Sequence, residues 1–331
     1  MIRLVRVELQ RLAARRLVLA AILGVIVSVG LVLWGTASTI RPLTPTQLEE
    51  AERSYDLAVQ DWQDNGAEYL QQCLDDQDRE RTLQDDPTLD FGCDQMGPPE
   101  RQWYVPVAPA LQDTLPAVLG PVVFLLGFAG LLIGATSTAA EMSTGAITTW
   151  LTFEPRRLRV YTSKLLAAGA FLVLPMALTL ALVVGGLWAI HAQQGLADTM
   201  TGQDWADAAA MSLRMLAVIV LGGIVGAALG ILLRHTAAVL GLVVGYAVLV
   251  ENLLGALAPR LQPALLLLNV SAWTQNGADY GVQECTTSSQ GTMCEYVQHT
   301  LSLDQGASYL AVLAAVIIVG SALVFRRRDV G

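Results

Sequence analysis

Six apolar runs, each 18 to 26 residues long, constrain this chain more than any other feature of its sequence. A helix needs about 20 residues to cross the hydrocarbon core of a bilayer. Backbone polar groups can be satisfied at that depth only inside helices or closed barrels. The sequence therefore predicts an all-α membrane protein with six transmembrane helices. The predicted spans are residues 17–36, 115–140, 165–190, 211–233, 237–257 and 308–325.

The overall composition supports this class. Apolar residues make up 53% of the chain and charged residues only 15%, and the mean hydropathy is +0.49. A soluble protein of this length is rarely so apolar. The amino terminus also has the positive charge and apolar run of a signal peptide. However, Leu17–Thr36 is longer than the usual apolar core of such a peptide, so we expect it to remain as the first span.

The distribution of Lys and Arg predicts the orientation in the membrane. Thirteen of these residues lie in segment 1–16, in segment 141–164, between the fourth and fifth spans, and in segment 326–331. The alternate loops, 37–114, 191–210 and 258–307, are together far longer but hold only six. Because short positively charged segments stay in the cytoplasm, we expect a multi-pass protein of the plasma membrane with both termini cytoplasmic.

The first predicted external loop, residues 37–114, is long and acidic. Between residues 41 and 113 it carries 17 acidic side chains and five arginines. Thr46 and Glu49 have the spacing of a capping box, and apolar spacing predicts a helix from about Thr46 to Leu74, bent near Asn65. We expect a mainly helical cap, too small to bury a large core without a disulfide or a neighbour.

The cysteines provide an independent test of this topology. All of them fall in segments predicted to be external, where disulfides persist: Cys73, Cys93, Cys285 and Cys294. Of the three possible connectivities, the local pairs Cys73–Cys93 and Cys285–Cys294 are favoured. Four free thiols are the alternative. A zinc site is less favoured, because His191 and His299 are the only histidines on that side.

Two charged residues approach the predicted membrane region from the outer side. Arg214 opens the fourth span and Glu251 closes the fifth, at similar depth, so they form a candidate ion pair. The alternatives are an Arg and a Glu that reach the interface separately, or a contact with substrate. After the fifth span, Leu261–Val270 is apolar but too short to cross, which predicts a re-entrant or interfacial helix.

Residues 1–16 are predicted to form an amphipathic helix in the cytoplasmic interface. Apolar residues at helical spacing form one face, and charged residues make up the remainder. The apolar residues are Ile2, Val5, Leu9 and Leu12, and the charged ones are Arg3, Arg6, Glu8 and Arg11. The alternative is an ordinary basic flank that only sets the topology.

The cytoplasmic loop 141–164 is the main candidate for a partner-binding site. Near its start it has the small residues Ser143, Thr144 and Gly145, and it continues through Trp150 and Phe153. The loop then contains Pro155 and four cations, Arg156, Arg157, Arg159 and Lys164. This pattern predicts a short helix over Ser143–Phe153 at the membrane surface, with the two aromatic residues as anchors for a soluble partner. An ordinary positively charged loop without a partner is the alternative.

Motifs for catalysis are absent from the sequence. It contains no G-x-x-x-x-G-K-[ST], no G-x-S-x-G and no H-E-x-x-H. We therefore expect no enzymatic activity from the chain alone, no cofactor or metal bound to it, and no nucleic-acid partner.

The loop also carries a family resemblance. Its pattern E…G…L-T…P-R-R…K resembles the permease subunits of ABC-2 type ABC transporters, as do the six spans and the N-terminal ELQRLAARR. The matching residues are Glu141, Gly145, Leu151, Thr152, Pro155, Arg156, Arg157 and Lys164. The resemblance covers most of the membrane portion but not the acidic loop.

The resemblance implies a working unit of several chains. The loop helix would be a coupling helix seated in a groove of a separate ATPase subunit, which binds the ATP and Mg. The N-terminal helix would brace the same subunit. Two ATPase subunits would serve two six-span halves, which are either the same chain or a paralogue.

Two functions follow from this resemblance as expectations. The first is an ATP-driven exporter of a hydrophobic or amphipathic substrate, because the predicted interior holds almost no fixed charge that would select an ion. The second is a sensory or regulatory membrane module, whose external cap binds a ligand or partner and signals to the ATPases. The sequence does not identify the transported compound.

Overall fold

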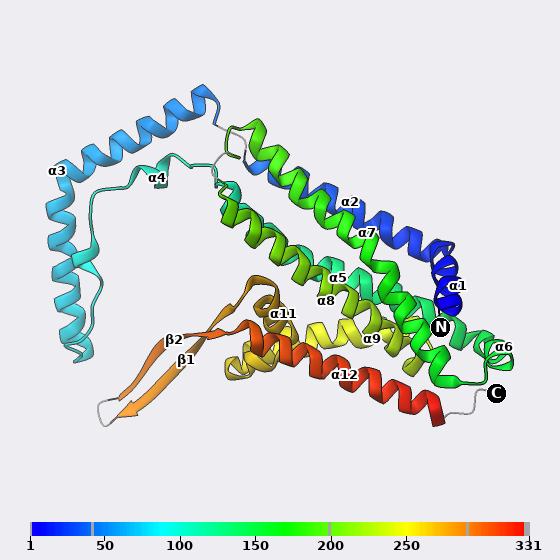
Figure 1. Cartoon of the computed structure of the whole chain (residues 1–331). Coiled ribbons are helices and arrows are strands. Elements are labelled where there is room, and N and C mark those ends of the chain that lie inside the picture. Colours follow the sequence, from blue (N-terminus) through cyan, green and yellow to red (C-terminus); the bar gives the residue numbers. More distant parts are fainter. Residues whose placement is uncertain (1, 41–42, 198–199, 289–290, 328–331) are drawn as a thin grey trace. The chain divides into compact units, whose positions relative to one another are not determined.

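The computed structural model describes residues 2–40, 43–197, 200–288 and 291–327 (Figure 1). The chain divides into two compact units. One comprises Met1–Thr36 and Ala110–Gly331, and the other comprises Ala37–Pro109. Both are mostly helical, as the sequence predicts.

Among the described residues, six helical segments are long and apolar enough to cross a membrane. Each contains one predicted span and extends beyond it, because the polar flanks continue the helical hydrogen bonding. The segments are α2 (Arg16–Thr39), α5 (Leu111–Ser143), α7 (Arg157–Gln193), α8 (Gly202–Leu233), Thr236–Leu257 and α12 (Leu303–Arg327). One consequence is that Lys164 lies inside α7 rather than in a loop.

The fifth segment is not a regular α-helix. It consists of α9 (Thr236–Gly245), a π-helical stretch η2 (Tyr246–Leu254) and α10 (Gly255–Leu257). The side chain of Asn252 donates to the carbonyl of Ala247, five residues back, at 2.7 Å. π-Helical stretches such as η2 are uncommon and are often found at functional sites.

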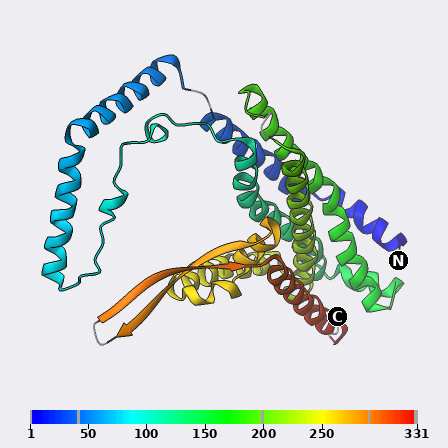
Figure 2. The ribbon, with the colours of Figure 1, turned by 60° about the vertical axis from the view of Figure 1, so that its left-hand side comes forward.

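The helices α5 and α8 lie side by side at the centre of the larger unit (Figure 2). Their backbones touch at glycines. A Cβ atom on Gly134 would lie 1.9 Å from the carbonyl oxygen of Gly223, and one on Gly226 would lie 2.1 Å from that of Leu131. The hydroxyl of Thr138 donates to the carbonyl of Ala227 at 2.8 Å. Such close approach is how helices associate where lipid supplies no hydrophobic drive.

The helix α12 is hydrogen-bonded to two neighbouring helices. The phenol of Tyr161 on α7 donates to the carbonyl of Ile318, and Ser321 donates to the carbonyl of Ala228 on α8, both at 2.8 Å. Apolar side chains of α5, α7 and α8 fill the core between the helices; the fully buried ones include Leu119, Leu126, Leu172, Leu187, Met215 and Ile219.

The fold is mostly helical, as predicted, but it also contains a β hairpin that the sequence did not predict. The strands β1 (Ala278–Ser288) and β2 (Gly291–Leu301) form an antiparallel hairpin. The predicted pair Cys285–Cys294 forms, and its two cysteines are directly opposed across the strands. The hairpin was missed because its residues are mostly polar, so no buried face marks the alternation of side chains that identifies a strand.

The apolar segment before the hairpin is helical, although the helix begins and ends later in the sequence than the predicted Leu261–Val270. A 3₁₀ turn η3 (Pro259–Ala264) precedes α11 (Leu266–Gln275), which ends at Asn276 in a left-handed conformation. The helix starts later than expected because Pro263 lacks the backbone N–H that an α-helix interior requires.

The smaller unit is a long helix with an extended return. It comprises α3 (Pro45–Gln84), a 3₁₀ turn η1 (Cys93–Gln95) and α4 (Arg101–Tyr104). Figure 1 shows that α3 bends partway along its length. The predicted disulfide Cys73–Cys93 joins the return to α3. A hydrogen bond from Arg101 also joins the two parts, and it lowers the pKa of Glu52.

The start of α3 corrects the predicted capping box. Thr44 and Gln47 form it, rather than Thr46 and Glu49. Proline is favoured in the first helical turn because its missing N–H is not needed there, and Pro45 therefore places the helix start two residues earlier.

Candidate functional site

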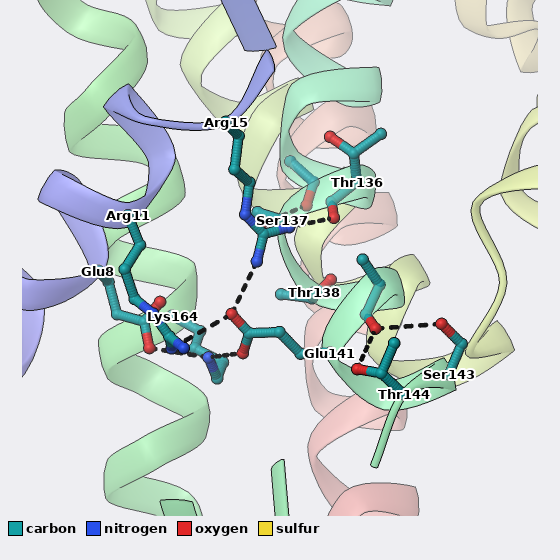
Figure 3. A network of polar contacts seen from close by, with 12 residues as sticks. Glu8, Arg11, Arg15, Thr136, Ser137, Thr138, Glu141, Ser143, Thr144 and Lys164 are labelled. Carbon is teal, nitrogen blue, oxygen red and sulfur yellow. Dashed lines mark hydrogen bonds and ion pairs between the residues drawn. The ribbon is translucent and has the colours of Figure 1, made fainter. Parts of the chain in front are cut away.

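The loop between α5 and α7 contains a short helix, α6 (Ala146–Phe153). The chain leaves α5 at Ser143 and turns at Gly145, whose φ is +69°. Only glycine adopts this conformation without strain. The helix therefore begins at Ala146, three residues later than the predicted start at Ser143. Ser143 and Thr144 belong to the end of α5, where their hydroxyls donate to the carbonyl of Ala140 at 3.1 and 2.8 Å (Figure 3).

The helix α6 has an inner and an outer side. Ile147 is buried in an apolar cluster with Tyr161 and Phe325. Trp150 is half-buried, and its ring lies 5.2 Å from the guanidinium of Arg11 and 5.7 Å from the ammonium of Lys164. In contrast, 84% of Phe153 is exposed. The two aromatic residues therefore differ: Trp150 contacts the protein's own cations, whereas Phe153 remains accessible.

A buried carboxylate, Glu141 at the end of α5, collects three cations (Figure 3). It accepts hydrogen bonds from Arg15 at 2.8 Å, from Arg11 at 3.5 Å and from Lys164. Only 4% of Glu141 is exposed. A carboxylate so far from water is tolerated only with partners of opposite charge.

A second carboxylate extends this cluster to the N-terminal helix α1 (Ile2–Ala13). Glu8 accepts a hydrogen bond from the buried ammonium of Lys164 at 2.8 Å. Arg15, between α1 and α2, donates to the carbonyl of Thr136 at 2.8 Å. The charge cluster, defined as Glu8, Arg11, Arg15, Glu141 and Lys164, thus joins α1, α5 and α7 beside α6.

The structure places the predicted residues of the N-terminal helix on two sides. Arg3 and Arg6 are exposed, as expected for an interfacial face. The apolar side packs inward, with Leu12 buried and Val5 and Leu9 against the core. Glu8 differs from the prediction: it is buried, because Lys164 lies opposite it.

The remaining cations of the loop lie around the start of α7. Arg156 is exposed and precedes the first residue of that helix, and Arg157 is half-buried. Arg159 pairs with Glu154 at 3.4 Å. Sequence reasoning did not predict the pairing of Glu141 with Lys164. The family pattern names both residues, but their contact depends on the packing of α5 against α7.

The predicted ion pair Arg214–Glu251 does not form. Arg214 donates to the side chain of Asn276 at 3.3 Å. Glu251 instead accepts the backbone N–H groups of Leu266 and Leu267 at 2.6 and 3.3 Å. These are at the N-terminus of α11, where free N–H groups and the helix dipole favour a carboxylate. The two charges are at opposite ends of α11, which the sequence did not reveal.

Comparison with known proteins agrees with this architecture. Residues 4–330 match the family described as ABC-2 family transporter protein. No curated protein and no solved structure matches the chain. The match covers both the membrane helices and the loop that holds α6, so this multi-pass membrane protein belongs to the ABC-2 family of transporter proteins.

Proposed function

We propose that this permease component of an ABC-2 transporter exports a hydrophobic or amphipathic substrate, driven by a separate ATPase subunit that docks on α6. The family match supports the class. The observation that carries the coupling is the division of α6 into an anchored inner side and an outer side that ends in an accessible Phe153.

The outer side of α6 has the features of a docking surface. Exposed small residues, Ser143, Thr144 and Gly145, lie at its start and allow another chain to come close. Phe153 lies at its end, and aromatic side chains of this kind are frequent interface anchors. Arg156 follows and suits an acidic partner surface or lipid phosphates.

The inner side transmits the motion of the partner. Trp150 contacts two members of the charge cluster, and these pair with Glu141 of α5 and Glu8 of α1. A displacement of α6 therefore acts on α1, α5 and α7 together. Separating the helices would expose or unpair buried charges, which is costly, so the ends of these helices are expected to move as one body.

The remaining parts of the working unit follow from the charge distribution and the family. The positive flanks support a cytoplasmic location for α6 and both termini, where ATP is available. ATP and Mg bind to the partner subunit, and two such subunits serve two six-span halves. The family match implies an ATPase partner, whereas this stoichiometry and topology are part of the proposal.

The test is co-purification of the chain with its ATP-binding subunit. Phe153→Ala should reduce the affinity at least about tenfold, because truncating a central aromatic anchor commonly costs more than 1.4 kcal/mol. Phe91→Ala is the matched control, since Phe91 is an exposed phenylalanine of the smaller unit. Unchanged affinity of the Phe153 variant would refute docking on α6.

The smaller unit favours a second candidate function, a sensory module. Residues 37–109 form their own compact unit, held by the disulfide Cys73–Cys93. In this alternative the unit binds a ligand or partner, and ATP hydrolysis reports the binding. Ligand-dependent ATPase activity without transport, in vesicles that contain the reconstituted complex, would favour the sensor over the exporter.

A further inference from the structure

Two cavities lie in succession along one face of the α5–α8 pair. The first, called the polar cavity, has a volume of about 410 Å³ and a lining that is about half polar; its polar side chains include Gln112, Asp204, Asp207, Arg214 and Asn276. The second, of about 320 Å³, is lined almost entirely by apolar groups, among them Val123, Gly127, Val218 and Gly222. Each volume falls within the range of about 300–1,000 Å³ typical of small-molecule sites.

The helical register shows that the cavities share a face. On α5 and on α8, the lining residues recur at three- and four-residue steps, which places them on one side of each helix. They are Pro116, Leu119, Val123 and Gly127 on α5, and Asp207, Met211, Arg214, Val218 and Gly222 on α8. The polar cavity occupies the first turns of both helices, and the apolar cavity occupies the turns that follow.

The helix α11 contributes lining residues to both cavities. Its first turns contribute Leu266 and Val270 to the apolar cavity, and its end contributes Gln275 to the polar one. It is fixed at its N-terminus by Glu251. Near its C-terminus, the indole of Trp273 donates to the carbonyl of Arg214 at 3.0 Å. The anchor at Arg214 lies where the polar lining of α8 gives way to the apolar lining.

The charges in the polar cavity select a type of headgroup. Two carboxylates, Asp204 and Asp207, lie in the same cavity as one guanidinium, Arg214. An anionic headgroup would meet an excess of negative charge. A zwitterionic headgroup can place its cationic group by the carboxylates and its anionic group by Arg214. The volume of the adjoining apolar cavity, about 320 Å³, is near the lower limit for small-molecule sites. A cavity of this size suits one hydrocarbon chain.

We propose that the two cavities together bind one single-chain zwitterionic phospholipid from the bilayer, with its headgroup in the polar cavity and its chain in the apolar one. The inference rests on the proposed export function only in treating this amphiphile as cargo. Binding itself requires neither ATP nor the partner subunit, so the two proposals can be tested separately.

The experiment measures binding of fluorescent lysophosphatidylcholine to the purified full chain in nanodiscs, without ATP. Gly127→Leu should fill the apolar cavity and weaken binding at least about tenfold, because nothing lies within 4 Å of a Cβ atom placed there. Gly185→Leu is the matched control: its Cβ position on α7 is equally open, and Gly185 lines neither cavity. This control should bind as the wild type does.

A second variant tests the headgroup without changing the packed core. The wild type should bind lysophosphatidylcholine at least about tenfold more tightly than lysophosphatidylglycerol. Asp207 has an exposed side chain, and Asp207→Asn removes one negative charge from the cavity. This variant should therefore show a smaller difference in affinity between the two lipids. The inference is overturned if the wild type binds neither lipid, if it binds both equally, or if Gly127→Leu binds normally. Loss of ATPase docking in the Phe153 variant would leave these binding constants unchanged.

Discussion

At the scale of single residues, the charge cluster shows how charge is accommodated beside the predicted membrane surface. Lys164 is shared by Glu8 and Glu141, while Arg15 and Arg11 also reach Glu141. Three cations thus balance two carboxylates drawn from segments far apart in the sequence. Since an unpaired buried charge costs far more than a paired one, each member fixes the position of the others.

Replacing the central carboxylate should therefore destabilise the protein. Glu141→Gln removes the charge that Lys164, Arg15 and Arg11 share, and breaking a buried pair costs about 3–5 kcal/mol. We expect a clearly lower midpoint of thermal unfolding in detergent. Glu154→Gln is the control, because its pair with Arg159 is partly exposed and such pairs contribute about 0–1 kcal/mol. Equal midpoints for the two variants would contradict the role assigned to Glu141.

At the scale of elements, glycines decide which helices can touch. The close contact of α5 with α8 needs Gly134 and Gly226, whose Cβ positions are occupied by the backbone of the other helix. Each of these glycines follows another glycine by four residues, Gly130 in α5 and Gly222 in α8. The same spacing occurs at Gly241 and Gly245 in α9, yet nothing lies within 4 Å of a Cβ atom at either position. A small-residue pattern thus predicts a possible close approach, but the tertiary structure shows which instance forms one.

A pair of substitutions on α5 tests this distinction. Gly134→Ala should destabilise the protein by about 1–3 kcal/mol, as overpacking does, because its Cβ must displace the backbone of Gly223. Gly127→Ala should be neutral or slightly stabilising, since its Cβ position is open and alanine is the better helix former. The measurement is thermal unfolding of both variants. A stable Gly134 variant would show that α5 and α8 are not in backbone contact.

At the scale of the whole molecule, the paired cysteines make the topology testable. All four cysteines of the chain are in disulfides, so the natural protein offers no free thiol. A single introduced cysteine therefore reports one position. Phe153 and Leu83 suit this purpose, because 84% and 72% of their respective surfaces are exposed.

Labelling with a membrane-impermeant maleimide should separate these two positions. In sealed right-side-out vesicles, Leu83→Cys should react and Phe153→Cys should not, whereas inverted vesicles should give the opposite result. This outcome follows from the basic segments on one side and the disulfide-bonded segments on the other. Reaction of both positions from the same side would refute the topology, and with it the docking of a cytoplasmic ATPase on α6.

The sequence by itself determined the features that depend on local composition. The six spans follow from runs of apolar residues, whose burial in lipid requires helices whatever their neighbours are. The two local disulfides follow from short separations between cysteines, because closing a short loop costs less conformational entropy than joining distant segments. A helix in the loop after the second span follows from the apolar segment that ends before Pro155, although its start at Ala146 depends on the turn at Gly145.

Only the tertiary structure decided which distant residues meet. The burial of Glu8 and the inward contact of Trp150 depend on the placement of Lys164 by α7. The separation of Arg214 from Glu251 depends on α11, which takes a place between them that the sequence did not specify. The physical reason is the same in each case. A charged or aromatic side chain can be satisfied by several partners, and the packing of helices determines which of them is within reach.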